Sequence, residues 1–252
     1  FKLIFYKNWD ELSKSDDYKL FFEENKEWLR PYAAFCYLRD QFKTSDFRQW
    51  SGYSTYNPDQ IMALTDPAQA FHEHIAVHYF QQYHLDKQLR EVVDYAHQKG
   101  VALKGDIPIG ISPNSIEAWT EPTLFNLDGQ AGAPPDDFAM MGQNWGFPTY
   151  NWDVMAADGY SWWKKRLLMM EKYFDAYRID HILGFFRIWE IPYNALHGLL
   201  GYFKPGLPMS SSEIEDWGLW FDEERFTKPY IRGYFLHDFF GEYADEVRRN
   251  YL

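Results

Sequence analysis

The sequence has a single cysteine, Cys36, in 252 residues, so no disulfide bond can form within the chain. Such sparing use of cysteine favours a reducing compartment, and we expect a cytoplasmic protein. No apolar run approaches the roughly 20 residues that a membrane-spanning helix requires, so we expect no membrane partner. The chain begins with Phe1 rather than methionine, and we expect it to be an internal piece of a longer protein.

Positive charge is also scarce, because 25 Lys and Arg face 37 Asp and Glu for a net charge of −12. Nucleic-acid-binding proteins usually carry a basic surface that displaces counterions from phosphates, so this balance argues against such a partner. The sequence lacks the glycine-rich loops of the P-loop and dinucleotide types, and it has no Gly-x-Ser-x-Gly motif. A neutral ligand therefore fits better than a nucleotide or a polyanion.

Aromatic residues, by contrast, are abundant: they make up 20% of the chain and include eleven tryptophans. Amphipathic rings of this kind stack on the faces of sugars. The alternative is that most of them build the core, since large rings are strongly buried in folded proteins. The surplus is compatible with a carbohydrate ligand without requiring one.

Hydrophobic spacing predicts a helical first part. Apolar residues at helical intervals predict helix from Asp16 to Phe42, and Pro31 is expected to divide this run into two helices. A second helix carries Leu85, Leu89, Val92 and Ala96 on one face, and Lys99-Gly100 should end it.

Two successive helix–strand units follow, which predict an α/β fold with a parallel sheet, either a barrel or a doubly wound sheet. A buried strand is expected over residues 101–109, and the next helix (163–174) leads into a strand over residues 176–181. Residues 112–152, rich in Gly, Pro, Asn and Asp, have no convincing period and are expected to form a long irregular loop above the carboxyl ends of the strands. Residues 205–229 are polar and acidic and should form a solvated connection.

The strongest chemical candidate is Asp180. Because side chains alternate along a strand, Arg178 and Asp180 share one face, where the guanidinium could keep the carboxylate ionised and oriented as a nucleophile. The alternative is an ordinary surface ion pair. Asp106 provides a second acid at a strand end, and the flanking Gly105, Pro108 and Gly110 would let a ligand approach the backbone.

A metal site is not expected. His74 and His78 could share a helix face next to His72, but the sequence Phe71-His72-Glu73-His74 is not the His-Glu-x-x-His motif, and no third ligand is evident. No cofactor is predicted.

Four motifs resemble those of the 4-α-glucanotransferases, or amylomaltases, of glycoside hydrolase family 77. They are Gly105–Gly110 (GDIPIG), Ala131–Phe138 (AGAPPDDF), Gly142–Trp152 (GQNWGFPTYNW) and Tyr177–Trp189 (YRIDHILGFFRIW). The Phe-Arg-Ile-Trp ending and the acidic stretch that ends in Thr227–Ile231 (TKPYI) are most similar to the cytosolic disproportionating enzymes that process maltose, and Trp28–Phe35 (WLRPYAAF) is similar to the helical segment of the family.

This resemblance implies part of a (β/α)8 TIM barrel with helical subdomain insertions. It implies a retaining transferase that moves glucosyl units from maltose or maltodextrin to an acceptor glucan through a covalent glucosyl-Asp intermediate. Asp180 would be the nucleophile and Arg178 the residue that keeps it ionised, while Asp106 would line the donor glucose site and His181 would bind substrate. Asp137, Phe138 and Trp145 match an aromatic loop over the acceptor.

The resemblance also implies an acid/base glutamate and a third aspartate, and neither motif is found in residues 1–252. Glu215-Asp216 and His237-Asp238 match them only superficially. We therefore expect the chain alone to be inactive, with residues 1–60 as a helical lead-in, 61–204 as a barrel segment and 205–252 as a truncated polar connection. Open strand edges would favour a homo-oligomer. Two other functions stay open, a non-catalytic glucan-binding module and an α-amylase-type hydrolase.

Overall fold

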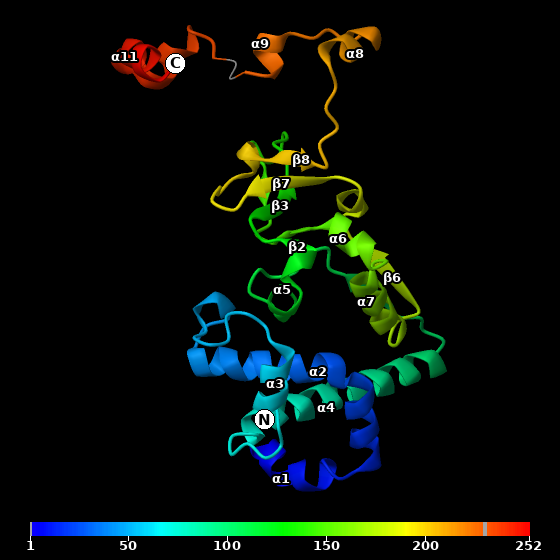
Figure 1. Ribbon diagram of the computed structural model, residues 1–252. Coiled ribbons are helices and arrows are strands. Elements are labelled where there is room, and N and C mark those ends of the chain that lie inside the picture. Colours follow the sequence, from blue (N-terminus) through cyan, green and yellow to red (C-terminus); the bar gives the residue numbers. More distant parts are fainter. Residues whose placement is uncertain (1, 229–230) are drawn as a thin grey trace. The chain divides into compact units, whose positions relative to one another are not determined.

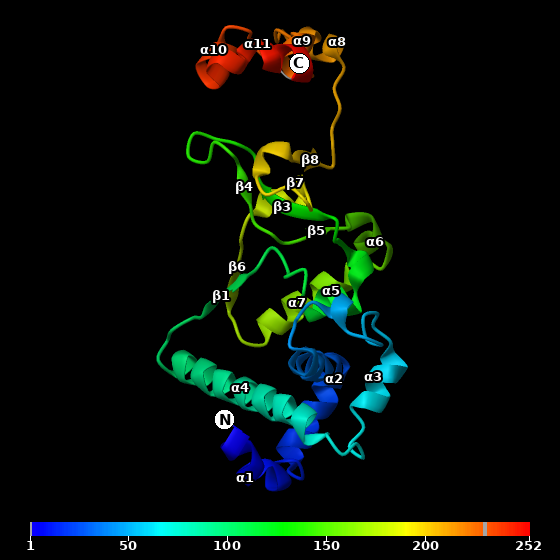
Figure 2. The same ribbon diagram turned by 90° about the vertical axis from the view of Figure 1, so that its left-hand side faces the viewer.

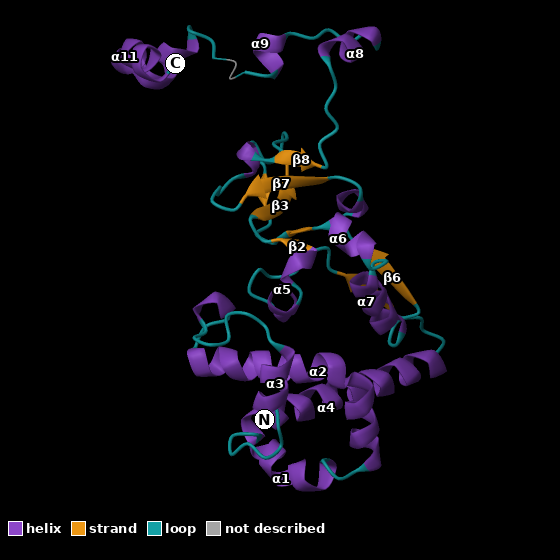
Figure 3. Ribbon diagram, viewed as in Figure 1, coloured by secondary structure: helices purple, strands orange, loops and turns teal. Residues whose placement is uncertain are grey.

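The computed structural model describes residues 2–228 and 231–252. Phe1 at the start of the predicted lead-in, and Pro229 and Tyr230 in the motif that ends the acidic stretch, lie outside the described residues. The chain divides into two compact units, residues 1–205 and 206–252, and each is considered by itself. Helices dominate the first hundred residues, and among the described residues all strands lie between residues 104 and 204 (Figures 1 and 3).

Four helices form the base of the first unit: α1 (Lys2–Leu12), α2 (Asp16–Phe42), α3 (Pro58–Leu64) and α4 (Glu73–Gln98), with a 3-10 turn η1 (Phe47–Gln49). The long helices α2 and α4 pack against each other (Figure 2). Ser15 caps α2 by accepting a hydrogen bond from the Tyr18 amide, and Asn57 caps α3 in the same way through Gln60. Their shared core includes Leu29, Ala33, Ala34, Trp50, Ile75, Phe80 and Trp119, all nearly inaccessible to solvent.

The predicted break at Pro31 is wrong, because α2 runs without interruption through that position. Proline removes one hydrogen bond of the helix ladder and normally bends or ends a helix. Here the residues on both sides, Leu29 and Ala33, are completely buried in the helical core. We attribute the continuity of α2 to this packing, which outweighs the local preference.

The two predicted helix–strand units are present. Helix α4 ends with Lys99 as its C-cap, and Gly100 takes the left-handed φ of 72° that the sequence indicated. Strand β1 (Lys104–Ile107) pairs in parallel with β6 (Ala176–Ile179), and α7 (Ser161–Glu171) precedes β6. Both strands are shorter than predicted; β1, expected to be buried, alternates between exposed and buried residues, and β6 is exposed along its whole length.

Residues 112–152 contain more regular structure than the irregular loop that we expected. They form α5 (Ile116–Thr120), η2 (Pro122–Leu124), β2 (Phe125–Asn126), β3 (Gly129–Ala133), β4 (Gln143–Asn144) and β5 (Thr149–Tyr150). Strands β2 and β5 pair antiparallel, and β3 joins an antiparallel sheet of order β4-β3-β7-β8 with β7 (Ile188–Pro192) and β8 (Tyr202–Lys204). Most of these strands have only two or three residues, which is too short for an alternating pattern to be visible in the sequence.

A second core lies beneath these strands. It includes Ile107, Leu124, Phe125, Tyr150, Met155 and Trp163, which come from β1, the 112–152 segment, α6 (Trp152–Ala157) and α7. Two further 3-10 turns, η3 (Ile182–Phe185) and η4 (Gly198–Leu200), connect β6 to β7 and β7 to β8. Because the other residues of this second core pack with Ile107 of β1, the segment between the two parallel strands is folded onto β1.

The second unit consists of short helices: α8 (Ser211–Asp216), α9 (Glu223–Phe226), α10 (Phe235–Phe240), η5 (Gly241–Tyr243) and α11 (Ala244–Tyr251). Ser210 and Glu213 form a capping box at the start of α8, and the amide of Ser210 lowers the pKa of the Glu213 carboxyl. Neither α8 nor α9 has a buried residue, as the acidic composition indicated. In the described part of both units, every helix is too short or too polar to cross a membrane.

Candidate active site at the ends of two parallel strands

Asp106 and Arg178 face each other across the two parallel strands. The register pairs Asp106 with Arg178, and the Arg178 Nη2 donates to Asp106 Oδ2 over 2.7 Å. The sequence-based interpretation placed the Arg178 guanidinium against Asp180 instead. Residues two apart on a strand are separated by about 6.6 Å, whereas directly paired residues on neighbouring strands lie closer, which accounts for the observed partner.

Asp180 directly follows β6, so it lies at the same edge of the sheet as the carboxyl end of β1, where Asp106 is located. The carboxyl ends of parallel strands meet at one edge, and active sites of α/β proteins are found there. Asp180, Asp106 and Arg178 are all exposed. The structure thus brings together the two acids and the arginine that the sequence singled out, with the ion pair assigned differently.

His181, two residues after the end of β6, has an unusual backbone conformation. Its φ of 51° and ψ of 54° are left-handed, a region that residues other than glycine seldom occupy and that often marks functional sites. His181 is the N-cap of η3, so this turn begins immediately after Asp180. The His181 ring meets the ring of Trp145 edge to face, with centroids 4.9 Å apart.

The predicted aromatic loop divides into two parts. Trp145 lies over the strand end through its contact with His181, and the Phe147 ring stacks beside it at 5.9 Å. The side chain of Phe138, by contrast, is 99% exposed, and Asp137 is exposed as well. The turn that carries them is held by Asp136, whose carboxylate accepts hydrogen bonds from the amides of Phe138 and Ala139. Only Trp145 of the three predicted loop residues is packed onto the strand ends.

The glycines near Asp106 play a different part from the one expected. A Cβ on Gly110 would lie 2.1 Å from the Phe147 ring, and one on Gly105 would lie 2.6 Å from Met170 and Phe174. Protein side chains, rather than an approaching ligand, occupy this space. Sequence analysis did not single out Phe147 or Gly184 and assigned Gly110 a different role, because these roles depend on contacts between distant segments.

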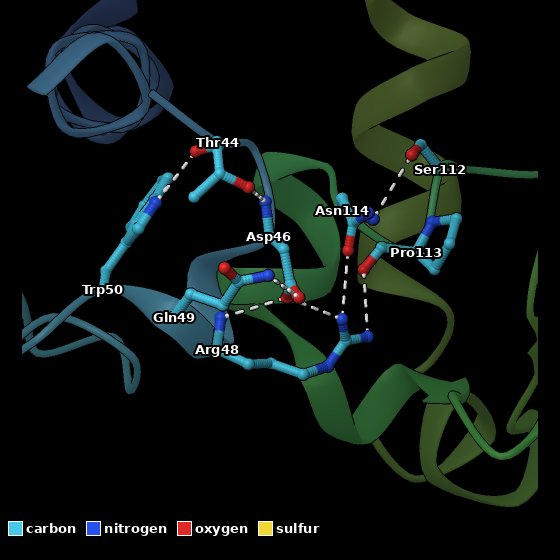
Figure 4. Close-up of polar contacts among 8 residues, drawn as sticks. All are labelled: Thr44, Asp46, Arg48, Gln49, Trp50, Ser112, Pro113 and Asn114. Carbon is cyan, nitrogen blue, oxygen red and sulfur yellow. Dashed lines mark hydrogen bonds and ion pairs between the residues drawn. The ribbon is translucent and has the colours of Figure 1, made fainter. Parts of the chain in front are cut away.

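The backbone after Asp106 is held by three side chains. Arg166 Nη2 donates to the carbonyl oxygen of Pro108 over 3.0 Å, and the Tyr150 hydroxyl donates to that of Ile109. Burial raises the pKa of Tyr150 to about 12, so this hydroxyl keeps its proton. Further along, Arg48 Nη2 donates to the carbonyl oxygen of Pro113 over 3.4 Å, and its Nη1 donates to Asn114 Oδ1 over 3.0 Å (Figure 4).

Arg48 is itself oriented by an acidic partner. Its Nη1 lies 2.8 Å from Asp46 Oδ1, and Asp46 also accepts from the side chain of Gln49 (Figure 4). The Gln49 hydrogen bond, followed by those of Arg48, lowers the pKa of the Asp46 carboxyl. The helical base thereby anchors the loop that follows β1.

The opposite ends of the two strands are also tied together. The Asp175 carboxylate, just before β6, accepts from the Leu103 amide over 2.8 Å and lies 2.9 Å from His97 Nε2. The Leu103 amide, and then His97, lower the pKa of Asp175. These bonds fix the register that places Asp106 opposite Arg178.

A cavity of about 700 Å³ lies on the other face of the strands. Ile107 and Ile179 contribute to its lining together with Tyr150, Trp152 and Trp163, whereas Asp106, Arg178 and Asp180 do not. Since side chains alternate along strands, this cavity is distinct from the site formed by Asp106, Arg178 and Asp180.

The histidines considered for a metal lie at the start of α4. Burial lowers the pKa of both His72 and His78. Across residues 2–228 and 231–252, the structure contains no group of three or more His, Cys, Asp or Glu side chains arranged to hold a metal ion.

Comparison with known proteins identifies relatives along the whole chain. Residues 1–252 match the glycoside hydrolase family 77 profile, described as 4-alpha-glucanotransferase. The 4-alpha-glucanotransferase DPE2 of Oryza sativa subsp. japonica is 49% identical over 96% of this chain and 26% of its own length. The 4-alpha-glucanotransferase of Chlamydia caviae is 37% identical over 70% of this chain and 32% of its own length. The chain thus spans about a quarter to a third of these relatives.

Solved structures give a similar result. The amylomaltase from Streptococcus agalactiae in complex with acarbose superimposes with a TM-score of 0.70 and 28% identity, covering 99% of this chain and 56% of that one. The amylomaltase from Corynebacterium glutamicum, at 21% identity and a TM-score of 0.57 over 74% of this chain and 24% of that one, supports the fold alone. With the family profile matched from end to end and the acidic strand ends in place, the chain belongs to glycoside hydrolase family 77, the 4-α-glucanotransferases.

Proposed function

We propose that this chain provides the nucleophile side of a retaining 4-α-glucanotransferase that acts on maltose or maltodextrin. The observation that carries the proposal is the pairing of β1 with β6, which presents Asp106 and Asp180 at one sheet edge. The names of its relatives supply the reaction class. In this proposal, β1 and β6 are neighbouring strands of a (β/α)8 barrel.

The Asp180 carboxylate attacks the anomeric carbon of the donor sugar, forming a glucosyl ester while the bond to the leaving sugar breaks. A second carboxyl group, about 5 Å from the first in retaining enzymes, protonates the leaving oxygen. The same group then takes a proton from the acceptor hydroxyl, whose oxygen displaces Asp180 and completes the new glycosidic bond. The proposal assigns this second carboxyl to no residue of this chain.

Asp106 and Arg178 support this chemistry by holding the donor. The ion pair with Arg178 fixes one carboxylate oxygen of Asp106 at the sheet edge. A carboxylate oriented in this way can accept hydrogen bonds from sugar hydroxyls. His181, next to Asp180, presents a ring to the same sugar in this arrangement.

The test is substitution of the nucleophile in a protein of full family length that contains this chain. Incubated with maltose, it should release glucose and form longer glucans together, and Asp180→Asn should reduce this rate by more than about 10³-fold. Asp94→Asn, an isosteric change of an exposed residue on α4, is the matched control and should retain activity. Residues 1–252 by themselves should produce neither product.

The result also separates the alternatives. Net gain of reducing ends without longer glucans would indicate a hydrolase. Glucan binding with no turnover, unaffected by Asp180→Asn, would indicate a binding module and contradict the proposal.

A further inference from the structure

Three aromatic rings form a row between the two strand ends. The Phe147 ring stacks on Trp145 with centroids 5.9 Å apart and an interplanar angle of 25°. Trp145 in turn meets His181 at 4.9 Å and 85°. The row therefore begins near the loop after β1 and ends on the residue that follows Asp180.

Each end of the row rests on a glycine. A Cβ on Gly110, four residues after Asp106, would lie 2.1 to 2.5 Å from three atoms of the Phe147 ring. A Cβ on Gly184 would lie 2.6 Å from His181 Cδ2 and 2.8 Å from Ile109 Cδ1. Contacts this short do not occur, so both positions have room for the rings only because they lack a side chain.

The backbone that carries the row is fixed to the antiparallel sheet. Trp145 donates its amide to the Ala131 carbonyl over 3.0 Å, and the Ala131 amide donates to the Phe147 carbonyl over 2.8 Å. The Trp145 indole donates to Gln143 Oε1 over 3.1 Å. Strand β3, which contains Ala131, also pairs with β7, the strand that follows η3. The rings are thus held by hydrogen bonds between their backbone and β3, and by close packing against both glycines.

We propose that Trp145 and Phe147 are positioning residues that act through the His181 ring to set the place of Asp180 relative to Asp106. The proposal rests on the transferase function above and gives Trp145 a role other than contact with the acceptor sugar. The reason is geometric, because the indole already contacts both the His181 ring and the Phe147 ring. His181 shares a peptide bond with Asp180, and its left-handed backbone restricts how the two residues can move relative to each other.

The first experiment follows the His181 ring by NMR in the 252-residue chain labelled at histidine. The chain has eight histidines, and the signal absent from His181→Gln identifies the one of interest. Phe147→Leu and Gly110→Ala change groups at the far end of the row, yet both should shift the His181 signals. Gly233→Ala is the matched control, because a Cβ there meets only the side chain of Arg248, in the second unit, and it should leave the signals in place.

The second experiment measures kinetics in the family-length protein. Because a misplaced nucleophile slows the chemical step, Phe147→Leu should lower kcat about tenfold with less than a twofold change in KM for the acceptor. Trp145→Leu should have the larger effect on kcat, since it breaks the row at its centre.

Two outcomes would overturn the proposal. If Phe147→Leu raises KM for the acceptor with kcat and the His181 signals unchanged, the rings serve as a sugar platform instead. If neither far-end variant moves the His181 signals while circular dichroism shows a folded chain, the row does not position His181. Since the NMR readout needs no turnover, it decides the inference even if the family-length protein proves not to be a transferase.

Discussion

Asp86, on α4, joins the helical base to the end of α7 through Lys172 and Tyr173. Its side chain is only 12% exposed and lies 2.8 Å from Lys172 Nζ and 2.9 Å from Arg90 Nε, and it accepts a hydrogen bond from the Tyr173 hydroxyl. Burial by itself would raise the pKa of Asp86, but the bonds from Lys172 and Tyr173 and the neighbouring charges hold it below its ordinary value.

Replacing this carboxylate should destabilise the chain in a pH-dependent way. We expect Asp86→Asn to lower the free energy of unfolding at pH 7 by about 1–3 kcal/mol, because Lys172 loses its charged partner. A carboxyl group whose pKa is lowered by folding stabilises the protein above its ordinary pKa, and this contribution disappears as the pH falls through the folded pKa. The difference between variant and parent should therefore shrink toward pH 3.

Urea denaturation at a series of pH values measures this difference. Asp94→Asn, on the exposed side of the same helix, is the control and should change stability little at any pH. A difference for Asp86→Asn that stays constant from pH 7 to pH 3 would contradict the role of its charge.

At the scale of the element, α2 lacks one backbone hydrogen bond because Pro31 lies inside the helix. Proline cannot donate to the carbonyl four residues earlier, so the helix loses a bond that alanine would make. Pro31 is only partly buried, while its neighbours Leu29 and Ala33 hold the helix in the core. We expect Pro31→Ala to stabilise the chain by about 1–3 kcal/mol, measured by chemical denaturation. A loss of stability would mean that the pyrrolidine ring makes packing contacts worth more than the hydrogen bond.

The same helix shows which elements the sequence could predict. The C-terminal half of α4 and its Lys99-Gly100 ending follow from local rules and were predicted correctly, whereas the helix begins earlier, at Glu73, and Leu85 and Val92 of the predicted apolar face are exposed. Pro31 misled the prediction because tertiary packing overrode a local signal. Strands β2, β4 and β5, with two residues each, exist only through their partners and leave no periodic pattern.

The candidate site has the same division between local and long-range information. Asp106 and Asp180 could be located at strand ends from the sequence, because strand boundaries and charged residues are local features. The partner of Arg178 could not, since the ion pair with Asp106 spans 72 positions and depends on the register of two strands. Likewise, the contact of Gly110 with Phe147 requires a fold in which the 112–152 segment returns onto β1.

At the scale of the whole molecule, the parallel pair of β1 and β6 has an unusual environment. Parallel sheets are normally covered on both faces, yet every residue of β6 is exposed, and β1 and β6 form a sheet of two strands within the part of the chain that the structure describes. Unpaired edges of this kind present free backbone donors and acceptors to another chain. The 252-residue chain should therefore self-associate as its concentration rises.

Sedimentation velocity across a dilution series tests this expectation. Tyr177, on β6, is 42% exposed, and Tyr177→Lys adds a charge to the strand, which should shift the chain toward the monomer because like charges on edge strands oppose pairing. Tyr95→Lys makes the same change on the exposed surface of α4 and should leave the association as it was. A chain that is monomeric at every concentration, or that responds equally to both substitutions, would show that the open strands are not the contact. If instead only Tyr177→Lys acts, association occurs through the same strands that place Asp106 and Asp180, so the oligomer and the candidate site compete for one surface.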